Sequence, residues 1–183
     1  MKKSRTLVAA LVFAGLLGTA CLFSPDPNNG TSVGFYSPVD SAWKVIYNFQ
    51  LAYETKNFDE YQKCLHDEFE FILLEQDWGD YNGDGVIDES WGKDLEELYT
   101  QRMFQSDNAD VIELILTGTN ESPYYGDTTG ATVQMMRSFE LKVYYYEDGT
   151  QKGVRAQGQA LFLVKPGPNG DYQIWQWTDL SEV

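Results

Sequence analysis

Residues 38–74 of this chain read PVDSAWKVIYNFQLAYETKNFDEYQKCLHDEFEFILL, and they contain the most informative pattern of the sequence. Between residues 41 and 55 the apolar side chains recur every three or four positions, which predicts an amphipathic helix with a wide buried stripe. Lys56-Asn57 interrupts that pattern, and a short second helix over 58–65 and a strand over 69–74 are predicted to follow. Two helices that lead into a strand therefore begin the folded domain.

The rest of the chain adds one more helix and then only strands. The third helix is predicted over 93–104, with an apolar face formed by Leu95, Leu98, Tyr99, Met103 and Phe104. Strands are predicted over 111–117, 132–146, 154–165 and 172–179. Asp148-Gly149 and Asn169-Gly170 are typical hairpin turns. Helices followed by a four-strand antiparallel meander predict an α+β fold, in which the helices cover one face of a curved sheet.

Three segments carry a resemblance to a known superfamily. They are KNFDEY (56–61), LHDEFEF (65–71) and YQIWQW (172–177). In order and spacing they resemble the nuclear transport factor 2-like superfamily, which includes ketosteroid isomerase and the polyketide-cyclase-like (SnoaL-like) proteins. The resemblance implies a cone-shaped α+β barrel over residues 38–183, with three N-terminal helices packed on a curved, mostly antiparallel sheet. It leaves open a homodimer formed through the outer face of the sheet.

The same resemblance implies where catalysis would take place. In the isomerase branch a hydroxyl donor and a carboxylate base stand in an apolar cavity between helices and sheet. Alignment on Asn57-Phe58-Asp59 puts these two roles at Phe49 and Leu73, whose side chains can neither donate nor accept a proton. A shift of one or two residues would bring Tyr53 or Glu70 into those positions.

We therefore expect a non-catalytic domain that binds a small ligand or a protein partner in or beside the cone. The alternative is a ketosteroid-isomerase-like lyase or isomerase that uses a pocket carboxylate as general base. No catalytic residue is assigned. The predicted ligand-binding residues are aromatic and basic side chains that could line a pocket: Trp43, Tyr53, Arg137 and Arg155. The polar strand residues could equally form a solvated outer face of the sheet; they are Glu113, Arg137, Glu140, Arg155 and Gln157.

Residues 80–88, DYNGDGVID, match the first nine positions of an EF-hand calcium loop. The predicted ligands are side-chain oxygens of Asp80, Asn82, Asp84 and Asp88 and the backbone carbonyl of Val86. Position twelve of the motif, usually a bidentate Glu, is Trp91, so affinity should be weaker. The alternative is a solvated acidic turn, because Asp, Asn and Gly also suit tight backbone geometry. A structural Ca²⁺ is the cofactor that the sequence predicts.

The N-terminus resembles the export signal of a bacterial lipoprotein. Its positive end consists of Lys2, Lys3 and Arg5. The apolar run over 7–17 is shorter than the ~20 residues of a membrane-spanning helix. Small residues then lead to Cys21, as in the lipobox of that family, although Gly18 stands where the family usually has Leu. An ordinary secretory signal beside a coincidental cysteine is the alternative.

This resemblance implies a signal peptide over 1–20, lipid such as palmitate on Cys21, and a flexible tether over 21–37. The lipid would anchor the domain to a membrane of the cell envelope, facing away from the cytoplasm. Residues 1–20 hold three bases and no acid, so their removal leaves 10 basic and 28 acidic residues, a formal net charge of −18. Such a charge excludes a general nucleic-acid binder, which needs a basic face for phosphates.

Overall fold

The structure is a computed structural model that describes residues 35–107 and 109–181. The expected signal peptide, Cys21 and most of the tether lie outside these residues. The helices are α1 (Ala42–Thr55), α2 (Phe58–Cys64) and α3 (Lys93–Phe104), with a short 3-10 turn, η2 (Glu75–Asp77). The strands are β1 (Leu65–Ile72), β2 (Ser90–Gly92), β3 (Ala109–Thr117), β4 (Glu121–Pro123), β5 (Val133–Glu147), β6 (Thr150–Pro166) and β7 (Tyr172–Asp179).

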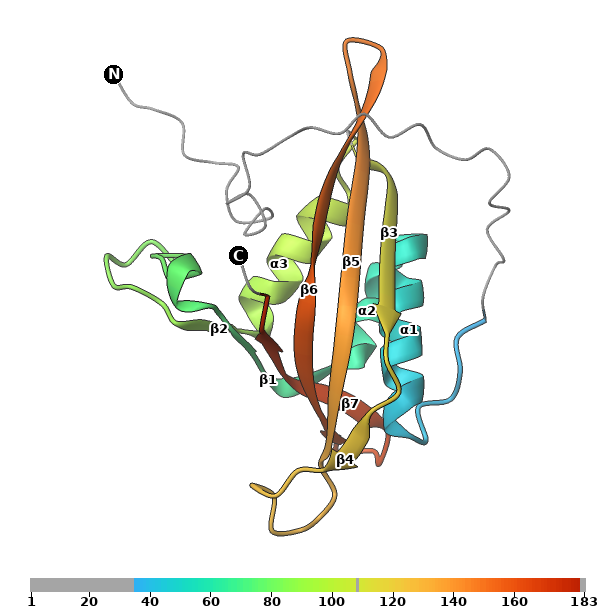
Figure 1. The fold of residues 1–183 in the computed structure, drawn as a ribbon, viewed down its shortest axis with the longest axis vertical. Helices are drawn as coiled ribbons and strands as arrows, with labels where there is room; N and C mark the ends of the chain where they lie inside the picture. Colours follow the sequence, from blue (N-terminus) through green and yellow to red (C-terminus); the bar gives the residue numbers. More distant parts are fainter. Residues whose placement is uncertain (1–34, 108, 182–183) are drawn as a thin grey trace.

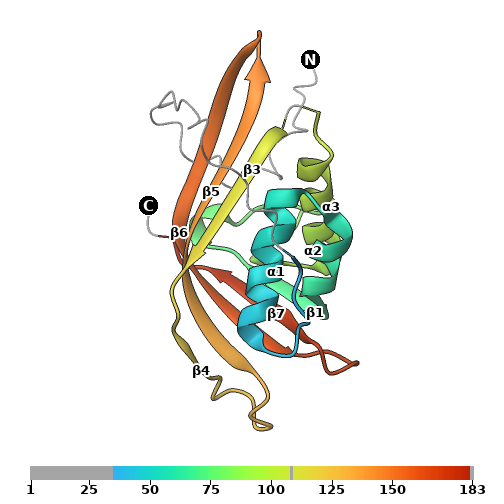
Figure 2. The ribbon, with the colours of Figure 1, turned by 90° about the vertical axis from the view of Figure 1, so that its right-hand side faces the viewer.

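One curved sheet contains all the strands, in the order β2-β1-β7-β6-β5-β3, and β4 also pairs with β5. Neighbours are antiparallel except β1 and β7, which are parallel. The three helices lie together on one face of the sheet (Figure 1; Figure 2). Three helices on a mixed, mostly antiparallel and open curved sheet confirm the predicted fold class. Within residues 35–107 and 109–181, none of the helices combines the length and the hydropathy of a membrane-spanning segment.

The break between the first two helices is set by local chemistry. Lys56 adopts a left-handed conformation, with φ of 50°, and its N–H bonds to carbonyls in the last turn of α1. Asn57 then caps α2, because its side-chain oxygen accepts the N–H of Glu60 at 3.2 Å. The interruption predicted at these two residues is thus confirmed.

Several predicted elements differ from the structure at their ends; among them, β6 begins at Thr150, four residues before the predicted start. β1 begins at Leu65, four residues before the predicted start. The polar run from His66 to Glu68 concealed this part of the strand, although Leu65 pairs with Ile174 in β7. The helical prediction for 58–65 ends one residue late for the same reason. The short β4, at the edge of β5, was not predicted because three exposed residues leave no alternation.

Candidate functional site

A buried carboxylate, Glu96 of α3, is the centre of the candidate site. The hydroxyl of Tyr61 donates to its Oε1 at 2.5 Å, and the indole N–H of Trp91 donates to its Oε2 at 2.8 Å. The hydroxyl of Thr100 lies 3.3 Å from Oε1 and 3.2 Å from the Tyr61 hydroxyl. All four side chains are buried. An acidic group surrounded by neutral donors is therefore held between α2, β2 and α3.

Each partner reaches Glu96 from a position that its element fixes. Thr100 follows Glu96 by one helical turn, so both point to the same side of α3. Tyr61 lies in the middle of the capped helix α2. Trp91 stands in β2 immediately before α3, and its ring stacks on Phe71 of β1 with centroids 4.6 Å apart. The donor set is thus fixed by the packing of α2, β2 and α3.

Burial dominates the electrostatics of this group. Desolvation raises the pKa of Glu96, although the hydrogen bonds from Tyr61, Trp91 and Thr100 favour the charged form and oppose the shift. The pKa of Tyr61 is raised well above its usual range by burial and then by the nearby Glu96. Burial likewise raises the pKa of Tyr53, with Glu96 as the second cause. A buried acid with perturbed tyrosines beside it occurs at acid–base sites and also in purely structural hydrogen-bond networks.

Aromatic rings pack the space between the helices and the sheet around this cluster. The ring of Phe49 lies 5.2 Å from Tyr53, 5.4 Å from Tyr61, 5.6 Å from Trp177 and 6.1 Å from Phe162, measured between centroids. All of these residues are buried. Among the buried side-chain nitrogens and oxygens of the described chain, only Nε1 of Trp177 lacks a hydrogen-bond partner. The interior is therefore a packed aromatic core with one unpaired donor.

The structure does not bring the four predicted ligand-binding residues together. Tyr53 alone joins the interior cluster, beside Tyr61 and Thr100. Trp43 is half exposed on the outer side of α1. Arg137 of β5 is buried beside the segment that joins β3 to β4. Its guanidinium donates to the backbone carbonyls of Asn120 at 3.1 Å and Met136 at 2.9 Å, and it lies 3.4 Å from the carboxylate of Glu121.

The fourth residue, Arg155, lies on the outer face of the sheet. It forms an ion pair with Glu140, whose other oxygen lies 3.4 Å from Nζ of Lys142. Lys142 is also 3.9 Å from Glu113 on β3. The residues on either side of Glu113 along β3, Ile112 and Leu114, are buried in the core. Ligand binding at Arg155 and a homodimer through this charged face both stay predictions.

The family alignment places the two catalytic roles at Phe49 and Leu73. Phe49 and Leu73 are both buried apolar side chains without a titratable group. Glu70, the residue that a shifted alignment would supply, points away from the core and contacts Ser90 at 2.8 Å and Gln176 at 3.4 Å. Glu96 was missed because the pattern of α3 favoured Leu98 for the buried face. In the structure Leu98 is exposed, and the helix instead buries Glu96 and Thr100 together with Tyr99 and Phe104.

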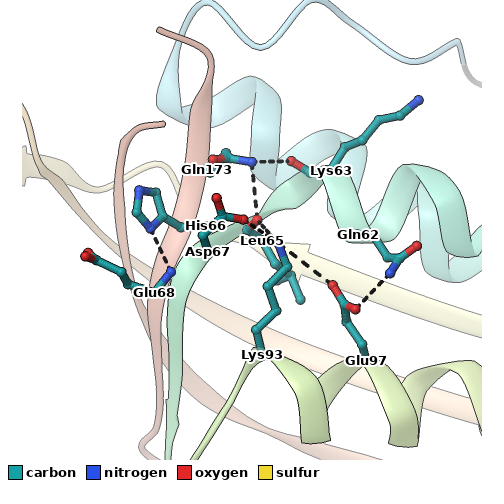
Figure 3. A network of polar contacts seen from close by, with 9 residues as sticks. All are labelled: Gln62, Lys63, Leu65, His66, Asp67, Glu68, Lys93, Glu97 and Gln173. Carbon is teal, nitrogen blue, oxygen red and sulfur yellow. Dashed lines mark hydrogen bonds and ion pairs between the residues drawn. The ribbon is translucent and has the colours of Figure 1, made fainter. Parts of the chain in front are cut away.

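A second polar network lies where α2 passes into β1 (Figure 3). Nζ of Lys93 donates to the carbonyl of Leu65 at 3.1 Å and lies 3.1 Å from Asp67. Nε2 of Gln173 on β7 donates to the carbonyls of Lys63 and Leu65, at 3.1 and 3.2 Å. These bonds satisfy carbonyls at the end of α2. The network therefore fixes the junction of α2, β1, β7 and α3 beside the buried cluster.

The single histidine belongs to this junction. Nδ1 of His66 accepts the backbone N–H of Glu68 at 3.0 Å, as Figure 3 shows. Burial lowers the pKa of His66, and the charge of Lys165 adds to the shift. The imidazole is accordingly neutral near pH 7, and its bonded nitrogen supports the backbone of β1.

The acidic segment between β1 and β2, here called the acidic arm (residues 75–89), projects from the body of the domain (Figure 1). Backbone N–H groups of the arm bond to its own side chains. Asp80 accepts from Gly83 (2.7 Å) and Gly85 (3.0 Å), and Asp88 accepts from Tyr81 (2.9 Å). Gly83 and Gly85 have φ of 81° and 88°, which glycine adopts without strain.

The remaining predicted calcium ligands lie in the same turn. Asn82 accepts the N–H of Asp84 at 2.9 Å, and Asp84 accepts that of Val86 at 2.8 Å. No group of three His, Cys, Asp or Glu side chains in residues 35–107 and 109–181 lies as a metal ion would require. A carboxylate keeps further lone pairs after accepting one or two N–H bonds. Calcium in the arm stays a prediction.

Comparison with known proteins matches the fold and not the sequence. Neither a family model nor a curated protein sequence matches this chain. Solved structures do. A nuclear transport factor 2-like superfamily protein from Salmonella enterica superposes with a TM-score of 0.51 at 13% identity, over 76% of this chain and 87% of that one. A conserved protein from Planctomyces limnophilus gives 0.54 at 14% identity, over 74% and 89%.

An enzyme is also among the similar structures. A hexachlorocyclohexane dehydrochlorinase superposes with a TM-score of 0.50 at 5% identity, over 76% of this chain and 81% of that one. At such identities the likeness concerns backbone architecture alone. The helices packed on the curved sheet, together with these neighbours, establish that this chain has the nuclear transport factor 2-like fold.

Proposed function

We propose that this chain is a non-catalytic binding domain of the cell envelope, anchored to a membrane by lipid on Cys21 and facing away from the cytoplasm. The packing of Phe49 is the observation that carries the non-catalytic role. Four aromatic rings surround it in the interior, where a substrate of an isomerase-like relative would have to lie. A small ligand or a protein partner would then be bound in or beside the cone without being transformed.

Metabolic labelling tests the anchor. The full chain is produced in a bacterial host that is supplied with labelled palmitate, and the protein is recovered from membranes. We expect label on the unaltered chain and on Cys64→Ser, which removes the buried cysteine, and no label on Cys21→Ser. An unlabelled wild-type chain would overturn the lipid anchor.

Calcium in the acidic arm is part of the same proposal, as a structural ion. The arm carries oxygen ligands at alternate positions and glycines that permit the turn, which supports the choice of a hard cation. Its expected effect is on stability, because an ion would relieve repulsion between the acids of the arm.

A second candidate function, a lyase or isomerase, is favoured by the contact between Tyr61 and Glu96. A buried carboxylate with a raised pKa could take a proton from a carbon beside a carbonyl, while the tyrosine donates to the oxygen. The similar fold of a dehydrochlorinase is consistent with elimination chemistry on this architecture.

Proton exchange distinguishes the two candidates. A panel of cyclic ketones is incubated in D₂O with the full chain, and exchange of the protons beside the carbonyl is followed by NMR. A non-catalytic domain gives the rate of buffer alone. Exchange that is faster with the wild-type protein and falls to the buffer rate with both Glu96→Gln and Tyr61→Phe would establish the enzyme instead.

A further inference from the structure

The outer side of α1 exposes two aromatic rings that the packed core does not use. Trp43 is 51% exposed and Tyr47 is 41% exposed, and their spacing of four residues puts both on the same side of the helix. Phe35, where the described chain begins, is 85% exposed. Rings that carry a polar group on an apolar body are enriched where a protein meets a membrane interface. We call Trp43 and Tyr47 the α1 aromatic face.

The first described residues of the chain, 35–37, lie along this helix. The backbone N–H of Ser37 donates to Oδ1 of Asn48 at 2.9 Å, and Nδ2 of Asn48 donates to the Ser37 carbonyl at 2.8 Å. The hydroxyl of Tyr36 lies 2.7 Å from that of Thr55, at the last residue of α1. Residues 35–37 are therefore fixed beside α1 (Figure 2).

The length of the tether and the charges near α1 limit how this helix can contact a bilayer. Residues 22–34 span at most about 50 Å even when fully extended, so a lipid on Cys21 keeps the start of the described domain within that distance of the bilayer. Lys44, next to Trp43, is paired with Asp40 at 2.6 Å, so this part of the helix presents no unpaired base for anionic headgroups. A mature chain with a net charge of −18 is repelled by such headgroups. A contact with the bilayer must therefore rely on the rings.

We propose that the α1 aromatic face docks on the interface of the bilayer to which the chain is anchored, with Trp43 and Tyr47 at the level of zwitterionic headgroups. This inference rests on the lipid anchor of the proposed function. Because the anchor keeps the face near the membrane at a high effective concentration, a weak contact is sufficient. The contact orients the domain, so that the acidic arm, on the other side of the fold, faces away from the membrane (Figure 1).

Tryptophan quenching tests the docking with the chain as it is processed. The lipidated protein is reconstituted into phosphatidylcholine vesicles whose acyl chains carry bromine close to the headgroups. Trp43 and Trp78 are the two exposed tryptophans of the described chain, and Trp78 lies on the acidic arm at 39% exposure. We expect quenching that is largely lost in Trp43→Phe, fully retained in Trp78→Phe and unchanged by added salt.

The outcomes separate the docking from the anchor. A protein that sediments with the vesicles but shows no quenching, or loses it only in Trp78→Phe, would overturn the docking and leave the anchor standing. A protein that fails to sediment with the vesicles would overturn both. The circular dichroism spectrum of each variant is compared with that of the wild type, because both substitutions keep an aromatic ring and should leave the fold unchanged.

Discussion

The buried cluster and the acidic arm use the same functional group in opposite ways. Glu96 receives its hydrogen bonds from Tyr61, Trp91 and Thr100, side chains that belong to three different elements, and water is excluded from it. Asp80 receives its bonds from backbone N–H groups three and five residues away, in full contact with solvent. The carboxylate of the core depends on the whole fold, whereas that of the arm depends on its own short segment.

This difference predicts how each region responds to change. A cluster assembled from distant elements should couple strongly to global unfolding, because its loss leaves buried donors unpaired. A locally satisfied, exposed turn should open without affecting the rest of the molecule. The following experiments test that contrast.

The largest effect is expected from Phe49→Ala. Removing a fully buried ring at the centre of the aromatic packing leaves a cavity, which should lower the free energy of unfolding by about 4 kcal/mol. Trp43→Ala, on the same helix but half exposed, should lower it by only about 1 kcal/mol. Urea unfolding followed by circular dichroism measures both. Equal losses would contradict the assignment of Phe49 to a packed interior.

Glu96→Ala should have the next largest effect. The substitution leaves the buried indole N–H of Trp91 without an acceptor and the hydroxyl of Tyr61 with only that of Thr100, at a cost of about 3 kcal/mol in the free energy of unfolding. Its neighbour Glu97, which contacts Gln62 and Lys93 near the surface, is the matched control. Glu97→Ala should cost less than about 1 kcal/mol. If Glu96→Ala also cost less than about 1 kcal/mol, the hydrogen bonds around Glu96 would contribute little to the stability of the fold.

The pH dependence of stability tests whether Glu96 is buried with a raised pKa. Because the pKa of Glu96 is higher in the folded than in the unfolded chain, the folded state binds more protons between the two pKa values. The contribution of Glu96 to stability is therefore complete below the unfolded pKa and is lost as the pH rises through the folded pKa.

Glu96→Gln removes this dependence because the amide does not titrate. We expect the free energy of unfolding of the wild type to fall relative to that of Glu96→Gln as the pH rises above the usual range of a glutamate. Urea titrations of both proteins at constant ionic strength between about pH 4 and pH 8 measure the difference. A difference that stays constant, or that grows in favour of the wild type, would contradict a raised pKa.

The smallest effect is expected in the arm. Millimolar Ca²⁺ should raise the melting temperature by a few degrees, because a bound ion stabilises the folded state by mass action. Asp84→Ala should abolish that rise, while Asp107→Ala, which removes an exposed acid outside the arm, should keep it. Differential scanning calorimetry measures the change in melting temperature, with Mg²⁺ as the control ion. An unchanged melting temperature in the wild type would remove the calcium proposal.

The same contrast explains what could be predicted from the sequence. The three helices, the meander and the break at Lys56-Asn57 follow from periodicity and capping, which act over a few residues. The turn of the arm follows from its own Asp, Asn and Gly residues. The Glu96 cluster could not be predicted in this way, because Tyr61 lies 35 residues away from it in the chain. Helical periodicity instead favoured an exposed leucine, Leu98.

The position of β7 has a consequence for how this domain is made. The strand nearest the C-terminus lies inside the sheet between β1 and β6, and Leu65 of β1 pairs with Ile174. Until residues 172–179 have been synthesised, β1 has no neighbour on that side and the aromatic interior lacks Trp177. A nascent chain therefore cannot complete its sheet early. On the proposed route of export, the sheet would close only after β7 has crossed the membrane.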